Sequence, residues 1–90
     1  MSIRIRLTSV FAERIEGIDV VDVDATTVES ALRTLTGRHP ELSRLLWISA
    51  GVLNPAVAVF VNDRLVPPDE LGVSVESGDE IDIIPAVAGG

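Results

Sequence analysis

The sequence contains no cysteine and no lysine, and its aromatic residues are two phenylalanines and one tryptophan. The absence of cysteine excludes disulfides and cysteine-based zinc sites, so any sulfur chemistry must use another atom of the chain. All seven positively charged side chains are arginines, so the chain offers no side-chain amine for an isopeptide bond to another copy of itself. Lysine-linked chains of this protein are therefore excluded.

Long apolar runs are absent as well. No run approaches the roughly 20 residues that a membrane span needs, and residues 1–4 lack the long apolar stretch of a signal peptide. We therefore expect a cytoplasmic protein without a membrane partner. The 90 residues, 47% of them hydrophobic, suffice for one domain with a single core.

Positive charge is scarce, because fourteen acidic residues face seven arginines and the formal net charge is −7. Nucleic-acid binding needs clustered positive charge, so this balance argues against it and favours a basic protein partner. Asp19, Asp22 and Asp24 lack the glycine and terminal glutamate of a calcium loop, so they are interpreted as a solvated strand face and no metal site is predicted. His39, beside Pro40 at a helix junction, is expected to have a surface or capping role.

Five segments have the apolar pattern of strands, in which every second side chain faces a core. The predicted strands are 3–8, 19–24, 56–61, 64–66 and 80–84, the second antiparallel to the first. Residues 62–63 and 77–79 are predicted turns. Residues 10–17 are a connection that forms either a short helical turn or a hairpin loop.

One helix is predicted over residues 27–36. Thr26 and Glu29 have the spacing of a capping box, and a stripe at positions 28, 31, 32 and 35 is apolar. Glu29 and Arg33 are four residues apart in the favourable order for an ion pair, and Gly37 is placed to end the helix. Pro40 and three leucines predict a second, shorter helical turn. Residues 47–55 fit a folded-back loop, an edge strand or a contact surface.

This order of elements predicts an α+β domain in which a mixed sheet packs on one main helix. A right-handed crossover after the second strand places the first and last strands side by side in the middle of the sheet, which is the β-grasp topology. The domain is expected to comprise residues 1–84, and residues 85–90 are expected to form a flexible C-terminal tail.

The tail is interpreted as the working part of the molecule. Pro85 is expected to end the ladder of the last strand, and Gly89 and Gly90 have no Cβ, so the terminal carboxylate can enter a narrow channel. Residues 86–88 are apolar, whereas a merely solvated tail would be polar. Six extended residues reach about 20 Å, which is enough to enter the active site of a partner. The carboxylate of Gly90 is then the reactive group.

Three motifs resemble the ubiquitin-like sulfur carriers: Val-Asn-Asp at 61–63, Gly-Asp-Glu at 78–80 and Ile-Ile-Pro-Ala-Val-Ala-Gly-Gly at 83–90. This family includes the thiamin-synthesis sulfur carrier, the small subunit of molybdopterin synthase and the actinobacterial cysteine-synthesis sulfur carrier. The last six residues are most similar to the cysteine-synthesis carrier, whereas Phe-Ala-Glu-Arg at 11–14 resembles the molybdopterin synthase subunit. The resemblance thus indicates the family, and the pathway stays open.

The resemblance implies that the protein is a co-substrate and not a catalyst. An activating enzyme is expected to use ATP to adenylate Gly90, and a sulfur donor then produces a thiocarboxylate that supplies sulfur to an accepting synthase. No cofactor is expected to be bound. The sequence agrees with this, since it has no Ser-His-Asp spacing, no phosphate-binding glycine-rich loop with lysine and no cysteine nucleophile.

The partner is expected to bind the tail segment Pro85, Ala86, Val87 and Ala88 together with an apolar patch beside it. If Val57, Val59 and Val61 face the helix, parity places Phe60 and Ile84 on the open face of the sheet, where they would mark a docking surface. Glu80 and Asp82 fit two interpretations equally, a solvated face or a contact with a basic patch of the activating enzyme.

Two other classes of function remain open. The first is a ubiquitin-like protein modifier, in which activated Gly90 joins a lysine of a target protein. The second is a binding module with an idle terminus, which predicts that deletion of Gly89 and Gly90 leaves the function unchanged.

Overall fold

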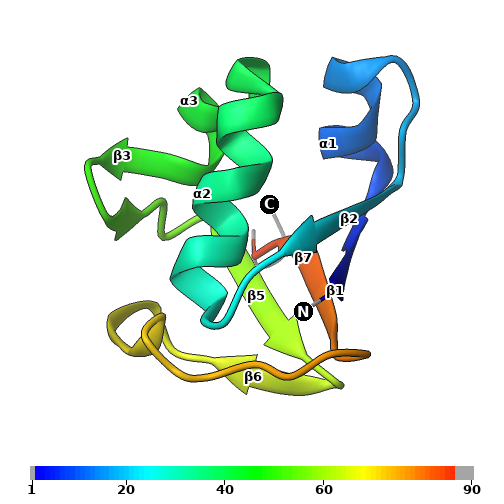
Figure 1. The fold of residues 1–90 in the computed structure, drawn as a ribbon. Helices are drawn as coiled ribbons and strands as arrows, with labels where there is room; N and C mark the ends of the chain where they lie inside the picture. Colours follow the sequence, from blue (N-terminus) through cyan, green and yellow to red (C-terminus); the bar gives the residue numbers. More distant parts are fainter. Residues whose placement is uncertain (1, 87–90) are drawn as a thin grey trace.

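The computed structural model describes residues 2–86, which form a five-stranded mixed sheet with helices on one face (Figure 1). The strands of this sheet are β1 (Ser2–Leu7), β2 (Val20–Asp24), β5 (Val57–Val61), β6 (Arg64–Val66) and β7 (Glu80–Pro85). A separate two-stranded hairpin consists of β3 (Trp47–Ser49) and β4 (Val52–Leu53). The helices are α1 (Ser9–Ala12), α2 (Val28–Arg38) and α3 (Ser43–Leu46), with 3-10 turns η1 (Glu13–Ile15), η2 (Pro40–Leu42) and η3 (Pro68–Glu70).

The strand order is β2-β1-β7-β5-β6, so the first and last strands lie together in the middle as predicted. β1 and β7 are parallel, and Ile5 lies opposite Ile81 while Leu7 lies opposite Ile83. β2 is antiparallel to β1, and β5 is antiparallel to β7. The β-grasp fold is therefore confirmed.

Helix α2 begins one residue later than predicted. Thr27 is the N-cap, and its side chain accepts a hydrogen bond of 3.0 Å from the backbone N–H of Ser30. The Ser30 hydroxyl accepts one of 3.1 Å from the Thr27 N–H, so the capping box joins Thr27 and Ser30, and the predicted pair of Thr26 and Glu29 is wrong. Glu29 instead faces outward and pairs with Arg33 at 3.3 Å, as predicted.

The end of α2 also differs from the prediction. Gly37 lies inside the helix, which continues to Arg38, and His39 is the C-cap with its N–H bonded to the carbonyl of Leu35 at 2.9 Å. The physical reason is Pro40, because a residue that precedes proline is disfavoured in the helical region. The capping interpretation of His39 is therefore confirmed.

The core lies between α2 and the sheet. The predicted stripe of α2 is buried, and it packs on the inward-facing residues of β1, β5 and β7. The stripe residues are Val28, Ala31, Leu32 and Leu35, and the inward strand residues include Ile3, Ile5, Val59, Ile81 and Ile83. The leucines of the shorter helical turn, η2 and α3, close one end of this core.

The two segments that the sequence left open are both folded. Residues 10–17 include the end of α1 and the turn η1, which buries Ile15. Residues 47–55 contain the β3–β4 hairpin, in which Trp47 lies opposite Leu53. The hairpin lies beside α3 and the start of β5 (Figure 1).

Truncation of the helix stripe tests the packing. Leu32→Ala and Leu35→Ala should each lower the free energy of unfolding by about 2 to 5 kcal/mol, because each removes a fully buried leucine side chain. Leu65→Ala is the matched control, since Leu65 is 56% exposed, and it should change stability by less than about 0.5 kcal/mol. Urea denaturation measures all three, and near-neutral effects at positions 32 and 35 would contradict this core.

Candidate functional site at the root of the C-terminal tail

The last strand extends further than the sequence predicted. Pro85 lies opposite Val57 in β7, and the N–H of Ala86 donates to the carbonyl of Ala56 at 2.8 Å. The prediction that Pro85 ends the ladder is therefore wrong on the β5 side. The root of the tail is held by the sheet as far as Ala86.

The position of Pro85 explains why a proline is tolerated there. In an antiparallel pair the N–H groups alternate between the two sides of a strand, and Ala86 is the residue that donates to β5. The nitrogen of Pro85 therefore faces the other side, where β1 has already ended at Leu7. The last contact there is from the N–H of Thr8 to the carbonyl of Ile83 at 3.4 Å, so the missing N–H of Pro85 has no partner to lose.

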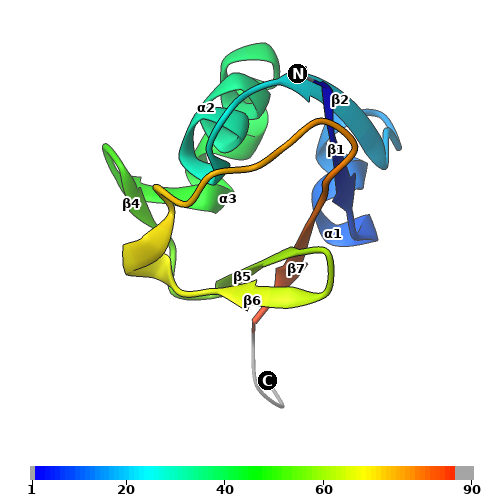
Figure 2. The ribbon, with the colours of Figure 1, turned by 60° about the horizontal axis from the view of Figure 1, so that its bottom comes forward.

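Residues 87–90 lie outside the described part of the chain. The roles predicted for Val87, Ala88, Gly89 and Gly90 therefore stay predictions. The described part ends with Ala86 hydrogen-bonded to Ala56 at the beginning of β5. In Figure 2 this end of β7 lies beside β5 and β6, and α2 lies at the opposite side of the view.

Two of the motifs that carry the family resemblance touch each other. Asn62 and Asp63 form the β5–β6 turn with φ angles of 48° and 70°, which asparagine and aspartate tolerate better than most residues. The Asn62 amide donates to Asp79 at 3.0 Å, and its side-chain oxygen accepts from the N–H of Glu80 at 3.0 Å. The other Asp79 carboxylate oxygen accepts from the N–H of Glu76 at 2.8 Å. We call this network the Asn62–Asp79 clasp.

The clasp fixes how β5 and β7 pair. It joins the turn after β5 to the turn before β7, and the N–H of Asn62 also donates to the carbonyl of Glu80 at 2.9 Å. A shift of one residue in this register would exchange the buried and the open faces of β7. Since the strand continues directly into the tail, the clasp determines which side chains lie beside the tail root on the open face.

The open face of the sheet carries an apolar patch next to the tail root. Leu65 and Asp82 lie opposite Phe60 on the neighbouring strands, and Ile84 lies opposite Ala58. Phe60 and Ile84 are both half-buried and share the open face, so their predicted placement is confirmed, while their role in docking stays a prediction. We define the sheet patch as Ala58, Phe60, Leu65 and Ile84.

Leu65 was missed at the level of the sequence. It is 56% exposed and is the largest exposed apolar surface of the patch. The two-residue turn at 62–63 carries the signal, because it pairs Phe60 with Leu65 and so places both on the same face.

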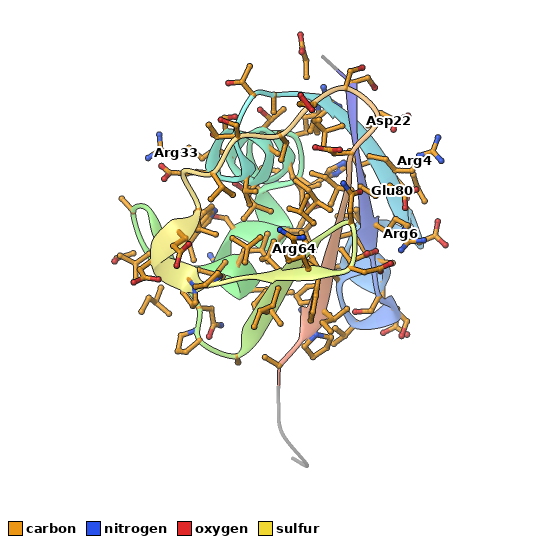
Figure 3. All side chains as sticks on the ribbon, turned by 90° about the horizontal axis from the view of Figure 1, so that it is seen from below. Arg4, Arg6, Asp22, Arg33, Arg64 and Glu80 are labelled. Atoms are coloured by element: carbon orange, nitrogen blue, oxygen red, sulfur yellow. The ribbon has the colours of Figure 1, made fainter. Side chains whose placement is uncertain are left out.

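Ion pairs cover the other half of the open face. Arg6 donates two hydrogen bonds to the Asp82 carboxylate at 2.6 and 2.9 Å and lies 3.8 Å from Glu80. These contacts raise the pKa of Arg6 above its usual range, and the hydrogen bond with Asp82 has the largest effect. Arg4 lies 3.7 Å from Asp22 in the same area, and Figure 3 shows Arg4, Arg6, Asp22 and Glu80 together along β1, β2 and β7. Asp82 is therefore engaged within the chain.

Two other features, a metal-binding cluster and a membrane-spanning helix, are not found in residues 2–86. Among residues 2–86, no group of three or more histidine, aspartate or glutamate side chains is arranged to hold a metal ion. Within the same range, no helix is long and apolar enough to cross a membrane.

Comparison with known proteins places the chain in a family. The model of the ThiS family matches residues 8–90. The chain belongs to the ThiS family. This family comprises sulfur carriers and ubiquitin-like small modifiers.

Relatives of this ThiS-family chain come from archaea and bacteria. A protein of Archaeoglobus fulgidus that is assigned as a sulfur carrier is 35% identical, and the match covers 100% of both chains. The crystal structure of SAMP1 from Haloferax volcanii is 32% identical over 100% of both chains, with a TM-score of 0.85. The structure of the Amycolatopsis orientalis BexX/CysO complex contains a chain that is 27% identical, with a TM-score of 0.84 and coverage of 98% and 99%.

The clasp should make stability depend on pH. Hydrogen bonds from the Glu76 N–H and then from Asn62 lower the pKa of Asp79 below its usual value. A carboxylate with a lowered pKa stabilises the fold above its unfolded pKa of about 3.9, and this contribution is lost as the pH falls below that value. Asp79→Asn should therefore be less stable than wild type at pH 7, with a difference that shrinks as the pH falls below about 4.

Thermal unfolding of both proteins between pH 7 and pH 2 measures this difference. Asp69→Asn serves as a control for the loss of one exposed carboxylate outside the clasp. A gap between Asp79→Asn and wild type that is constant over the whole pH range would contradict the role of the Asp79 charge.

Proposed function

We propose that this ThiS-family chain is a sulfur carrier whose reactive group is the carboxylate of Gly90. The observation that carries the proposal is the anchored tail root, since the sheet holds the chain through Ala86 and the family match continues to residue 90. Residues 87–90 then span about 13 to 14 Å when extended, shorter than the reach expected for six residues. This distance suffices to carry the carboxylate into a narrow active site while the domain stays outside.

The chemistry follows from the state of the carboxylate. An unperturbed C-terminal carboxyl has a pKa of about 3.3 to 3.7, so at neutral pH it is ionised and inert to nucleophiles. An ATP-using enzyme activates it: a carboxylate oxygen attacks the α-phosphate, pyrophosphate leaves, and an acyl-adenylate forms. A sulfide-equivalent donor then attacks the acyl carbon, and AMP leaves with the former carboxylate oxygen. The product is the thiocarboxylate that supplies sulfur to the accepting synthase.

The sulfur-carrier function requires three kinds of partner. An activating enzyme, a sulfur donor and an accepting synthase each have to reach the same terminus, and a relative that is 27% identical is known in a complex with another protein. The sulfur enters the synthesis of cysteine, molybdopterin, thiamin or a related sulfur metabolite.

The sheet patch is proposed as the surface that docks on the activating enzyme. It adjoins the tail root, and its members present apolar side chains on the open face, which no helix of residues 2–86 covers. The bidentate pair of Arg6 and Asp82 borders the patch, so a partner meets an apolar surface with a polar rim.

Phe60→Asp tests this docking surface. A carboxylate at the centre of the patch should weaken binding to the activating enzyme roughly tenfold or more, because it would be buried without a partner in the complex. The melting temperature should stay near that of wild type. Val20→Asp is the matched control, since Val20 is 43% exposed on β2 away from the patch, and it should bind normally. A large loss of stability for Phe60→Asp would show that Phe60 belongs to the core.

The tail itself is tested by its length and bulk. A variant with one residue added after Gly90 should fold and dock normally but support no ATP–pyrophosphate exchange, because its carboxylate is displaced from the reacting position. Gly89→Val should also block exchange, since its side chain widens the chain where it enters the channel. Val87→Asp should mainly raise the KM. Normal exchange by the extended variant would contradict the requirement for a carboxylate at position 90. An unchanged function after deletion of Gly89 and Gly90 would favour a binding module with an idle terminus.

A protein modifier is the second candidate. It is favoured by the 32% identity over the full length to SAMP1, which related structures describe as a small archaeal modifier protein. Both functions begin with the same adenylate, and they differ in the nucleophile that replaces AMP. Lysine-linked adducts of a tagged chain in cell extracts, without any thiocarboxylate, would support the modifier. Since the chain has no lysine, such adducts would join it to other proteins.

A further inference from the structure

A second candidate surface lies away from the sheet patch, at the β3–β4 hairpin. A shallow hollow of about 440 Å³ opens between α2, α3 and the hairpin, and its lining includes Arg33, Arg44, Trp47 and Ile48. The other lining residues are two serines, an alanine and a glycine. We call this surface the hairpin hollow, and neither the sulfur-carrier chemistry nor the sheet patch uses it.

The charge of the hairpin hollow is opposite to that of the molecule. Its lining contains two arginines and no carboxylate, in a chain whose formal net charge is −7. Arg33 is held only from one side, by Glu29 at 3.3 Å, and Arg44 makes no ion pair within residues 2–86. Figure 3 places Arg33 on the far side of the molecule from the paired Arg4 and Arg6. Since Arg44 makes no ion pair within residues 2–86, it can pair with a carboxylate of another protein.

The apolar part of the hollow is exposed but ordered by the fold. Trp47 is half-buried, and its indole N–H donates to the Thr36 hydroxyl at 3.3 Å, which fixes one side of the ring. Ile48 is 63% exposed, and Val52, which lies outside the hollow on the neighbouring strand, is 46% exposed. Exposed apolar side chains beside arginine and tryptophan have the composition of a protein-binding surface.

The hairpin is physically joined to the tail root through Asn54. The Asn54 amide donates to the carbonyl of Leu45 at 3.0 Å, and its side-chain oxygen accepts from the N–H of Ala56 at 2.9 Å. Ala56 in turn accepts the N–H of Ala86 at 2.8 Å. The end of the hairpin and the root of the tail thus share a short network, at the end of the sheet where β5 begins. A partner that takes the tail therefore meets the end of the sheet to which the hairpin is bonded.

We propose that the hairpin hollow is a second docking surface, which binds an acidic segment with an apolar side chain on the activating enzyme that takes the tail. This inference rests on the proposed function. Arg44 and the free side of Arg33 bind carboxylates, and Trp47 and Ile48 bind the apolar side chain. Together with the sheet patch, the hollow sets the orientation in which the tail is delivered.

Two other occupants fit the hollow less well. A symmetric contact between two copies would bring two Arg33 and two Arg44 side chains together, and like charges in contact oppose association. A nucleic acid offers phosphates to the arginines, but its charge extends along the whole strand and would meet the acidic remainder of a chain with net charge −7. A short acidic protein segment can place its few carboxylates at the two arginines alone, so it fits the hollow better.

Trp47 provides a direct reporter, because it is the only tryptophan of the chain. The probe is the adenylating enzyme of the same cell, purified by ATP–pyrophosphate exchange that depends on this chain. A chain labelled with 5-fluorotryptophan gives one fluorine NMR signal, which should shift when the enzyme is added. The shift should persist in the variant extended after Gly90, since docking does not require the reaction.

Kinetics of the exchange reaction give the second readout. Arg44→Glu and Ile48→Asp should each raise the KM about tenfold or more with kcat nearly unchanged, because they remove binding that is equal in the ground and transition states. Arg64→Glu is the matched control, since it makes the same charge change at an exposed position of β6 whose side chain alternates to the face opposite to Leu65 and the sheet patch. Its KM should stay within about twofold of wild type.

The outcomes separate the two claims. Suppose that wild type supports exchange but the Trp47 signal stays unchanged at saturating enzyme, or that Arg44→Glu behaves like Arg64→Glu. The hairpin hollow is then not a docking surface, and the sulfur-carrier proposal stands. If no adenylating enzyme accepts the wild-type chain, the proposed function fails and the inference fails with it.

Discussion

The position of β7 between β1 and β5 is the constraint on which the rest of the structure depends. Its inward residues complete the core beneath α2, and its outward residues form part of the open face. On the β1 side the pairing ends at Ile83, whereas on the β5 side it continues to Ala86. The described chain therefore ends beside β5, and Pro85 occupies a position at which no backbone N–H is needed. The clasp at the other end of β7 keeps this register. The same network that stabilises the fold therefore determines which side chains lie beside the tail root.

The distribution of charge gives the molecule two different faces. Arginines on the open sheet face are largely neutralised by carboxylates of the same sheet, whereas Arg44 at the hairpin has no such partner within the described residues. A partner that contacts both faces needs an apolar site for the sheet patch and carboxylates for the hairpin. Such a pattern restricts orientation more strongly than a single apolar contact would, since a reversed complex leaves charges unpaired.

Elements with a strong local pattern could be predicted from the sequence. The stripe of α2, the alternation in β1 and β2 and the parity of Phe60 and Ile84 all follow from periodicity, and the family was evident from the end of the chain. The capping box was misplaced by one residue because Thr26 and Thr27 both fit an N-cap, and only the structure shows that Ser30 completes it. The β3–β4 hairpin could not be predicted, because strands of two and three residues are too short for a periodic pattern. The clasp and the Asn54 network join residues distant in sequence or depend on backbone carbonyls, and no local signal reports such contacts.

The central claim is that the Gly90 carboxylate carries sulfur, and intact-mass spectrometry tests it most directly. The chain with its native terminus is incubated with its activating enzyme, ATP and a sulfur donor, and the modified residue is located by fragmentation. We expect a mass gain equal to one oxygen-for-sulfur exchange, localised to Gly90 and dependent on ATP. An adenylated Gly90 that yields only lysine-linked adducts, and never this mass, would show that the chain is not a sulfur carrier.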